Sequence, residues 1–429
     1  MTVLLISYNY TPELTGIGKY NGEMAAHLVA QGHQVKFITG YPYYPQWKVH
    51  QGYKNSGFSS ESIDGVSVTR CPLYVPINPS GVKRILQDFS FFISSFVIIT
   101  SLILQRKKYD TVFAVAPSFM NGLTALWYTL FFPNAKIVYH LQDLQIDAAK
   151  DLGVLKNKFL LNILFSVEKC ILSRVDLVST ITTAMQRKIA SKKAVLKKSV
   201  VFPNWTDILD SSSGLPDNTI LKSLNIPTDK KIVFYSGAVG EKQGIEIILD
   251  VAQMAIKNLT DVFFVIAGAG PYMEKLKQGV AELSLTNIQF INLLPKPEFN
   301  SLLRLATLHL VIQKRSASDL VMPSKLATIF GVGGLALVTA EKDTSLHTLI
   351  TEHKMAIIVE PENALHLYNS IYNVVQSLNN FNGGVMNTFP DSTVFINLDT
   401  LKSNAIDYAR QNLSKEGIIN EFLKTVQTL

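Results

Sequence analysis

Short hydrophobic runs alternate with longer amphipathic stretches along this chain of 429 residues. The short runs are rich in Val, Ile and Phe, which favour buried strands, and the longer stretches carry apolar residues at helical spacing. This alternation predicts an α/β protein with parallel sheets covered by helices. The predicted strands are Val3–Tyr8, Val35–Thr39, Val66–Cys71, Thr111–Ala116, Lys136–Tyr139, Leu177–Thr180, Ser199–Phe202, Ile232–Ser236, Val262–Ala267, Ile288–Ile291, Leu308–Ile312, Leu335–Thr339 and Ala356–Val359.

The predicted elements form two sets, and each set opens with a strand, a glycine-containing loop and an amphipathic helix. A segment rich in Ser, Gly and Pro separates them at about residues 203–218. We therefore predict one Rossmann-like domain over residues 1–205, a second over 206–400, and a helical tail over 401–429 that packs back across the domains. Ligands of such sheets bind at the carboxyl ends of the strands, so we expect functional residues in the loops that follow the strands.

One hydrophobic stretch, Ile85–Leu104, is nearly long enough to span a bilayer and has basic flanks. We reject a spanning helix, because it would separate the first strands from the strands with which they must pair. Two compatible interpretations remain: a helix buried against its own sheet, and a helix whose outer face enters the membrane interface while the flanks contact anionic head groups. A later basic run would support such docking: Arg187, Lys188, Lys192, Lys193, Lys197 and Lys198.

The formal net charge of +7 is unevenly distributed. Residues 1–205 hold 22 Lys and Arg against 11 Asp and Glu, and the remainder holds 18 against 22. The basic half indicates contact with an anionic surface, and on charge alone both nucleic acid and anionic lipid are candidates. The two cysteines lie far apart, which is typical of reduced packing residues in a cytoplasmic protein. We expect no cleavable signal peptide.

A glycine-containing loop, Thr15–Gly22, follows the first predicted strand. Gly16 and Gly18 precede a helix that we expect to begin near Lys19, and their exposed N–H groups suit a phosphate or a sugar hydroxyl. The loop resembles a dinucleotide fingerprint, but its third glycine comes one residue late and the loop is too long for the tight turn. An ordinary glycine turn is the alternative interpretation.

The second half carries three further ligand-type loops, each at the end of a predicted strand. Two are glycine-rich, and the third precedes an apolar helix and offers Asp319 for a sugar hydroxyl. Together they predict a site for a nucleotide diphosphate in this half. The residues that we expect to contact it are Gly237, Lys242, Gly268, Gly270 and Lys325.

Polar residues also follow the strand Lys136–Tyr139 in the first half. We predict that His140, Gln142 and Asp143 are catalytic, together with Asp319; a structural histidine at a strand end is the alternative for the first of them. The chain contains no Asp-x-Asp motif, which is the usual metal clamp of a sugar diphosphate. We therefore expect no metal, and expect positive side chains and helix N-termini to stabilise the leaving diphosphate.

Several long strings together resemble glycosyltransferase family 4, whose members have the GT-B fold of two Rossmann-like domains facing a cleft. The resemblance covers nearly the whole chain. It is closest to the WcaI type of colanic-acid biosynthesis enzymes, a group usually described as fucosyltransferases. The strings that carry it are Asn9–Tyr20, Tyr41–Trp47, Arg70–Pro76, Phe202–Trp205, Tyr235–Gly244 and Lys314–Lys325.

The resemblance implies a retaining, metal-independent transfer of fucose from GDP-fucose to a lipid-linked exopolysaccharide precursor, with the nucleotide sugar as co-substrate and no cofactor. It implies a cytoplasmic bacterial protein peripherally associated with the inner membrane, whose first domain binds the acceptor and whose second binds the donor. It matches Gly16 and Gly18 to a loop near the donor phosphates and the acceptor. It places Lys242 and Lys325 in segments that face the diphosphate.

The sequence departs from the general family at one point. The family carries two glutamates separated by seven residues, whereas here the first is replaced at best by Asp319 and the second falls near Thr328. The WcaI type lacks the pair too. Two other functions remain as alternatives. A sugar-nucleotide epimerase could use His140 and Asp143 as an acid/base pair but has no use for a membrane-facing half. A nucleic-acid-binding protein rests on the basic half alone, without a recognisable binding module.

Overall fold

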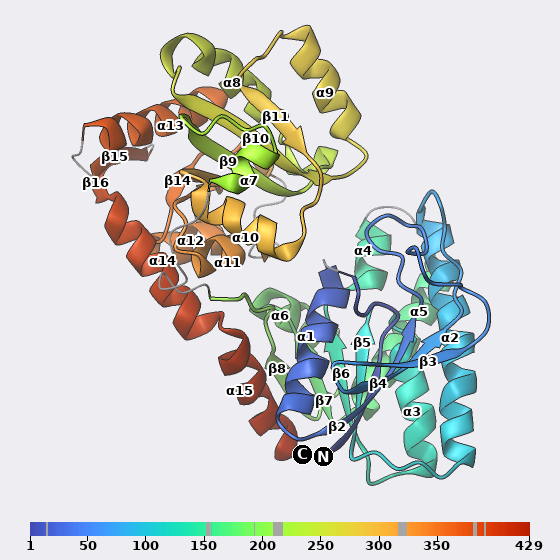
Figure 1. Cartoon of the computed structure of the whole chain (residues 1–429). Helices are drawn as coiled ribbons and strands as arrows, with labels where there is room; N and C mark the ends of the chain where they lie inside the picture. The colour runs from blue at the N-terminus through green and yellow to red at the C-terminus, as the bar shows by residue number, and fades with distance from the viewer. Residues whose placement is uncertain are drawn as a thin grey trace. The chain divides into compact units, whose positions relative to one another are not determined.

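The computed structural model of the chain divides into two compact units (Figure 1). The N-terminal unit consists of Met1–Asn204 with Ile418–Leu429, and the C-terminal unit consists of Trp205–Gly417. The units divide one residue before the domain boundary predicted at residue 205, and both contain part of the predicted tail. The structure describes residues 1–13, 16–151, 155, 157–192, 194–208, 218–315, 324–380, 384–389 and 392–429.

The N-terminal unit is built on an eight-stranded sheet in the order β3-β4-β2-β1-β5-β6-β7-β8, in which every neighbouring pair is parallel except β3 with β4. Its central strands are buried on both faces, which is why they read as continuous apolar runs. The strands are β1 Thr2–Ile6, β2 Gln34–Gly40, β3 Ser59–Ile63, β4 Val66–Cys71, β5 Thr111–Ala116, β6 Lys136–Leu141, β7 Leu177–Thr180 and β8 Ser199–Val201.

Helices cover both faces of this sheet (Figure 1). One face packs against α2, α3, α5 and α6, and the other against α1 and the second part of α15, whose Phe422 stacks on Phe202 with ring centroids 3.8 Å apart. The C-terminal segment is thereby tied into the N-terminal unit. The helices are α1 Gly16–Ala30, α2 Gly81–Leu104, α3 Asn121–Phe131, α4 Gln145–Asp151, α5 Lys158–Arg174, α6 Thr183–Ser191 and α15 Lys415–Gln427.

Helix α2 contains the long hydrophobic stretch of the sequence. By length and composition it is the one described helix that could cross a membrane, a test that a core helix of a soluble protein also passes. Its inner face packs on the sheet through residues such as Phe91, Ile99 and Leu102. About two thirds of its most apolar window is not buried. The helix therefore belongs to the unit's own fold, and its outer face is apolar and exposed.

The C-terminal unit is built on a six-stranded parallel sheet in the order β11-β10-β9-β12-β13-β14, with one hydrophobic core on each face. Its strands are β9 Lys231–Ala238, β10 Val262–Ala269, β11 Ile288–Ile291, β12 Leu308–Val311, β13 Ala336–Thr339 and β14 Ile357–Val359, and an antiparallel hairpin follows as β15 Gly384–Phe389 and β16 Ser392–Asn397. Its helices are α7 Thr219–Ser223, the 3₁₀ turn η1 Glu241–Gln243, α8 Ile247–Asn258, α9 Met273–Glu282, α10 Lys296–Leu305, α11 Ser324–Gly331, α12 Ser345–His353, α13 Ala364–Asn379 and α14 Leu398–Asn412.

The structure corrects several predicted elements. The first strand ends at Ile6, and the helix after it begins at Gly16 instead of near Lys19. Strand β3 and the hairpin β15–β16 were missed. The residues of β3 are mostly polar and exposed at the edge of the sheet, so they lack the buried apolar pattern by which the other strands were recognised.

Candidate active site

The loop after β1 is organised around the buried carboxyl group of Glu13, 3% exposed. Its Oε1 accepts hydrogen bonds from the backbone N–H groups of Tyr43 and Tyr44, both 3.0 Å long, and its Oε2 accepts one from Asn9 Nδ2 at 2.8 Å. Burial nevertheless raises the pKa of Glu13 to about 7, because desolvation outweighs these bonds. Glu13 thus joins the loops that follow β1 and β2.

Both predicted glycines of this loop are required by its geometry. Gly16 has φ +62°, a conformation that side chains disfavour, and opens α1. A Cβ on Gly18 would lie 2.5 Å from Glu13 Oε2. Glycine here lets the start of α1 approach the Glu13 carboxyl group, so the N-terminal turn of the helix is held at the carboxyl edge of the sheet.

The structure places His140 in the interior of the N-terminal unit, 2% exposed. Its Nδ1 lies 3.0 Å from Ser179 Oγ, and its ring packs on Phe202 with centroids 5.1 Å apart. Burial lowers the pKa of the imidazole to about 3, so the ring is neutral at pH 7. This geometry suits a packing role, and the catalytic role that we predicted for His140 gains no support from it.

Gln142 and Asp143, in contrast, lie just beyond the end of β6, where the backbone N–H of Gln142 bonds to Ala116 O at 3.1 Å. Although Asp143 is open to solvent, surrounding protein atoms desolvate its carboxyl group and raise its pKa. These two residues therefore occupy the strand-end position that the sequence predicted. No contact in the structure tests their catalytic role.

Asp143 belongs to a group of polar side chains of which the sequence indicated no other member; Tyr8 and Asp88 are buried, and Arg84 and Asp143 are exposed. Asp88 of α2 is 6% exposed and accepts a hydrogen bond of 2.9 Å from Gln145 Nε2. Desolvation raises the pKa of Asp88 to about 7, whereas its hydrogen bonds and the nearby Arg84 lower it by less. Burial and the charges of Asp88 and Asp143 raise the pKa of Tyr8.

In the C-terminal unit, Lys325 lies beside the loop after β9. Its Nζ lies 4.1 Å from the centroid of the Tyr235 ring and would be 3.8 Å from a Cβ on Gly237. Although part of Lys325 reaches solvent, desolvation lowers the pKa of its ammonium group to about 7. Gly237 has φ +141°, which favours glycine. The predicted pair of a glycine loop and a lysine is thus brought together.

Two glycines at the carboxyl end of β10, Gly268 as its penultimate residue and Gly270 just after it, permit close backbone approach to the end of β9. A Cβ on Gly268 would overlap the carbonyl oxygen of Gly237, and a Cβ on Gly270 would overlap that of Val239. Both positions require glycine, and the loops after β9 and β10 form one surface of backbone groups beside Lys325. Such a surface suits a phosphate-bearing ligand.

Other predicted residues are tested less directly. The side chain of Lys242 and the whole of Asp319 lie outside the described residues. Nearby, Lys314 Nζ lies 3.1 Å from Glu246 Oε1. Within the described ranges, no group of three or more His, Cys, Asp or Glu side chains is placed to hold a metal ion. Metal independence stays a prediction.

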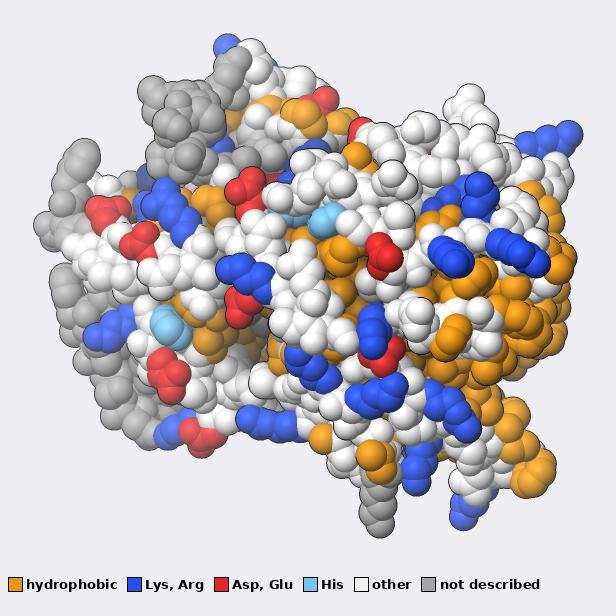
Figure 2. Space-filling view, turned by 90° about the horizontal axis from the view of Figure 1, so that it is seen from below, with side chains coloured by type: hydrophobic (Ala, Val, Ile, Leu, Met, Phe, Trp, Pro, Cys, Tyr) orange, Lys and Arg blue, Asp and Glu red, His pale blue; other side chains and the backbone are white. Residues whose placement is uncertain are grey.

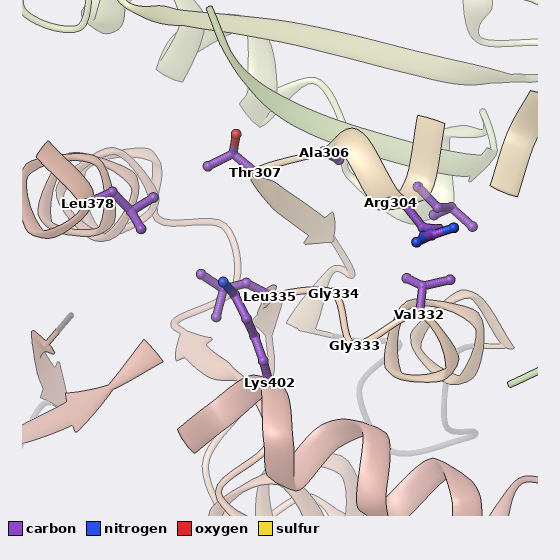
Figure 3. A pocket seen from close by; sticks show the side chains of 10 residues that line it. Arg304, Ala306, Thr307, Val332, Gly333, Gly334, Leu335, Leu378 and Lys402 are labelled. Atoms are coloured by element: carbon purple, nitrogen blue, oxygen red, sulfur yellow. The ribbon is translucent and has the colours of Figure 1, made fainter. Parts of the chain in front are cut away.

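One cavity of about 170 Å³ in the C-terminal unit lies away from these loops (Figure 3). It is lined by Thr307 and Leu335, which precede β12 and β13, and by Arg304 and Lys402. Gly237 and Gly268 lie at the carboxyl ends of β9 and β10, whereas this cavity lies at the amino ends of the parallel strands β12 and β13. We therefore assign the cavity no part in the predicted site.

Comparison with known proteins shows the family to which the chain belongs. Residues 15–205 match a family model described as a glycosyl transferase 4-like domain, and residues 216–376 match one described as glycosyl transferases group 1. The chain is 35% identical over 438 residues, covering 100% of both chains, to the WcaI protein of Escherichia coli (strain K12), whose name gives it a glycosyl transferase role in colanic acid biosynthesis. The chain belongs to glycosyltransferase family 4. Within that family it is of the WcaI type.

Solved structures of glycosyltransferases share its fold. The sucrose-phosphate synthase of Thermosynechococcus elongatus has a TM-score of 0.69 at 15% identity, covering 100% of this chain and 98% of that one. Anabaena Alr3699/HepE, solved with UDP and glucose, has a TM-score of 0.66 at 13% identity and 100% coverage of both chains. The predicted GT-B fold is confirmed. At such identities the likeness shows the fold alone.

In the basic run that begins in α6 and continues beyond it, three lysines are paired within the N-terminal unit. Lys192 pairs with Asp147 and with Glu168, Lys188 also reaches Asp147 at 3.5 Å, and Lys197 pairs with Asp176 at 2.9 Å. These charges are engaged within the N-terminal unit, where they join α4, α5 and α6. These three lysines are therefore not free for docking on lipid; Lys193 lies outside the described residues, and the use of the rest of the run stays a prediction.

Proposed function

We propose that this glycosyltransferase transfers fucose from GDP-fucose to a lipid-linked exopolysaccharide precursor with retention of configuration, without metal, at the cytoplasmic face of the inner membrane. The observation that carries the proposal is the 35% identity over the full length to a protein named for colanic acid biosynthesis. The resemblance to fucosyltransferases of that type supports the donor.

The geometry of the C-terminal unit supports a diphosphate-bearing donor. Lys325 lies beside Gly237, and the glycines at the end of β10 let that backbone approach the end of β9 closely. An anion near Lys325 would restore the charge that desolvation disfavours, since a nearby negative charge raises the pKa of a lysine. In the transition state this charge would stabilise the leaving diphosphate, whose negative charge grows as the sugar departs.

Retention of configuration at the anomeric carbon is compatible with a site that has no buried histidine base. In the proposed step the acceptor hydroxyl attacks the anomeric carbon on the face from which the diphosphate leaves, and a leaving oxygen accepts the hydroxyl proton. This route requires neither an enzyme nucleophile nor a buried histidine base, which agrees with the interior position of His140. Asp319 and the residues Gln142 and Asp143 remain proposed contacts to the sugars.

Membrane association is supported by one surface of the N-terminal unit. Side chains of α2, α3 and α5 that are at least 40% exposed form what we call the apolar face: Val82, Leu86, Phe89, Ile93, Val97, Leu104, Leu130, Phe131, Phe159, Leu160 and Ile163. Figure 2 shows hydrophobic side chains gathered on the side of α2 and α3, with Lys and Arg among them. Arg106, Lys107 and Lys108 follow α2 directly and are exposed. Apolar side chains with basic neighbours match an anionic membrane surface.

The proposal is tested first by thermal unfolding with GDP-, UDP- and dTDP-sugars, each with and without EDTA. A ligand at about 100 times its dissociation constant stabilises the protein by roughly 2.7 kcal/mol. We expect stabilisation by GDP-fucose and GDP that EDTA does not change. Stabilisation by UDP-sugars alone would exclude the fucosyl donor, and loss of the shift in EDTA would exclude metal independence.

A further inference from the structure

The carboxyl group of Glu13 is buried although no cation is bonded to it. Its oxygens accept three hydrogen bonds, and all three donors, the N–H groups of Tyr43 and Tyr44 and the side-chain amide of Asn9, are uncharged. Desolvation makes the ionised form costly at this position. A large apolar side chain would fill the same space without this cost but would leave the donors without an acceptor. The hydrogen bonds therefore explain a carboxyl group here better than packing does.

Arg70 of β4 holds the same two loops at a second point. Its guanidinium is fully buried and donates to the carbonyl oxygens of Thr11 and Gly40, the latter at 3.2 Å. Its Nε pairs with Glu61 Oε1 at 2.6 Å. Thr11 lies in the loop after β1, and Gly40 ends β2. Because a buried cation needs fixed acceptors, the starts of both loops are held in place on the sheet.

Helix α1 packs directly against the loop that carries Glu13. A Cβ on Gly22 would overlap Thr11 Oγ1, and a Cβ on Gly18, one turn earlier on the same face, would lie 2.5 Å from Glu13 Oε2. The absence of side chains at these two positions lets the helix approach the loop closely over its first two turns. The position of the first turn of α1 therefore depends on where the Glu13 carboxyl group lies.

We propose that Glu13 is a positioning residue for sugar transfer. Its carboxyl group fixes the loop after β2 and the first turn of α1 in one arrangement at the carboxyl edge of the N-terminal sheet, where the ligands of such sheets bind. Glu13 acts through the backbone of these two segments and contacts no reacting group. The inference rests on the proposed function, since it requires that these segments face a ligand of the transfer reaction.

The first test compares two variants of Glu13 in transfer from the nucleotide sugar that the thermal screen selects. Glu13→Gln keeps an oxygen that can accept the N–H groups of Tyr43 and Tyr44, and it should retain kcat/KM within about threefold. Glu13→Ala leaves both N–H groups without this acceptor, so the loop shifts. It should lower kcat/KM per folded molecule by about tenfold or more, as displacement of positioning groups does.

The control for the effect of stability alone is Val178→Ala. Val178 is buried in β7, which three other strands of the sheet separate from β2. The variant should lower the free energy of unfolding, because it leaves a cavity in the core, and should leave kcat/KM per folded molecule unchanged. Urea unfolding of each preparation gives the folded fraction.

The second test is the pH dependence of amide hydrogen exchange, corrected for its intrinsic dependence on pH. The pKa of Glu13 is about 7 in the closed structure and has its usual value of 4.5 when the side chain is exposed. Ionisation therefore favours opening, and the equilibrium that exposes the Tyr43 and Tyr44 amides should rise by about tenfold between pH 6 and pH 8. Glu13→Gln should show no such rise.

The other charged or titratable groups that face Glu13 do not change charge in this range. They are the guanidinium of Arg70 from β4 and the phenols of Tyr43 and Tyr44, whose pKa values are raised by burial. Helix α1 presents Gly18 to the carboxyl group and adds no charge there. A change in exchange between pH 6 and pH 8 that Glu13→Gln abolishes is thus assigned to Glu13.

Three results would overturn the inference. The first is an unaltered kcat/KM per folded molecule in Glu13→Ala. The second is an equal loss in Glu13→Ala and Glu13→Gln, which would show that transfer requires the charge and not the hydrogen-bond acceptor. The third is exchange at Tyr43 and Tyr44 that does not depend on pH in the unaltered protein, a result that decides the matter even if Glu13→Ala does not fold.

Failure of this inference is distinguishable from failure of the proposed function, because the exchange measurement uses no substrate. If UDP-sugars alone stabilise the protein, the fucosyl donor fails, while the Glu13 variants are compared with that sugar and the exchange result stands. If fucose is transferred from GDP-fucose and Glu13→Ala does so at the unaltered rate, the proposed function stands and the inference falls.

Discussion

The two units share a parallel α/β architecture but build their candidate sites from different materials. In the C-terminal unit, Gly237, Gly268 and Gly270 bring backbone groups to one surface beside the side chain of Lys325. In the N-terminal unit, segments distant in sequence meet at two buried carboxyl groups, Glu13 with the loop after β2 and Asp88 of α2 with Gln145. A backbone surface suits a phosphate, whereas converging side chains suit a ligand with many hydroxyl groups.

Desolvation acts in opposite directions in the two sites. It lowers the pKa of Lys325 to about 7 and raises the pKa values of Glu13 and Asp88 to about 7. Near neutral pH, Lys325 is therefore only partly protonated, and Glu13 and Asp88 are only partly ionised, in the ligand-free protein. A bound anion would raise the pKa of Lys325 and so restore its charge, whereas the raised pKa values leave Glu13 and Asp88 partly protonated near pH 7.

The largest expected effect is on the C-terminal side of the comparison. Lys325→Met should lower kcat for sugar transfer by about 10²–10³-fold, because it removes the charge nearest the proposed leaving group. Lys277→Met, at an exposed position of α9, is the control and should leave the rate unchanged. The rates are measured as fucose incorporated from GDP-fucose. Equal rates in the two variants would remove Lys325 from the diphosphate site.

The pH dependence of GDP binding tests whether Lys325 has the lowered pKa that its desolvation implies. With a pKa of about 7 in the free protein, Lys325 is protonated below pH 7 and loses its charge above it. Between pH 7 and pH 8.5 the protonated fraction falls from about one half to about 3%, so GDP affinity should fall by up to about 15-fold. Lys325→Arg keeps its charge and should bind GDP with little change over this range. A pH-independent affinity in the unaltered protein would contradict the desolvated lysine.

The next effect is on membrane binding through the apolar face, which belongs to the N-terminal unit alone. The double variant Phe89→Glu, Ile93→Glu should weaken binding to phosphatidylglycerol vesicles by about tenfold or more, because each side chain loses its favourable transfer into lipid. Leu365→Glu, at a 61% exposed position of α13, is the control and should bind normally. Cosedimentation measures both. If the double variant binds as well as the control, lipid does not cover the apolar face.

The smallest expected effect distinguishes a packing role of His140 from a catalytic one. His140→Phe should lower the free energy of unfolding by about 1 kcal/mol, since the hydrogen bond to Ser179 is lost in the interior. The transfer rate per folded molecule should stay within about twofold of the unaltered rate. Urea unfolding and kcat are measured on the same preparation. A large loss of kcat at unchanged stability would restore the catalytic role that the sequence predicted.

The sequence predicted much of the fold because its central strands are buried on both faces. Runs such as Val3–Ile6 and Thr111–Ala116 are apolar at every or nearly every position, and the loops between them are marked by Gly and Pro. The exposed edge strand Ser59–Ile63 has no such signal. Burial of His140 was not predicted either, because the strand was expected to end at Tyr139, whereas it runs to Leu141 and holds His140 within the sheet.

Local motifs revealed the C-terminal site more readily than the N-terminal one. Gly237 and Gly268 lie at the carboxyl ends of their strands and Gly270 follows directly, so the chemistry of this site is visible in short strings of sequence. Asp88 is hydrogen-bonded to Gln145, 57 residues away in the sequence, and Glu13 is hydrogen-bonded to backbone N–H groups 30 and 31 residues away. Contacts at such separations depend on the order of strands in the sheet, which a single sequence does not reveal.

Hydrogen exchange of backbone amides, measured with GDP-fucose and separately with anionic vesicles, decides whether the C-terminal unit binds the donor and the N-terminal unit contacts the membrane. We expect GDP-fucose to protect residues 237–244 and 268–272, and vesicles to protect α2, α3 and α5. Protection of the N-terminal unit alone by GDP-fucose, or of the C-terminal unit alone by vesicles, would contradict this division of roles.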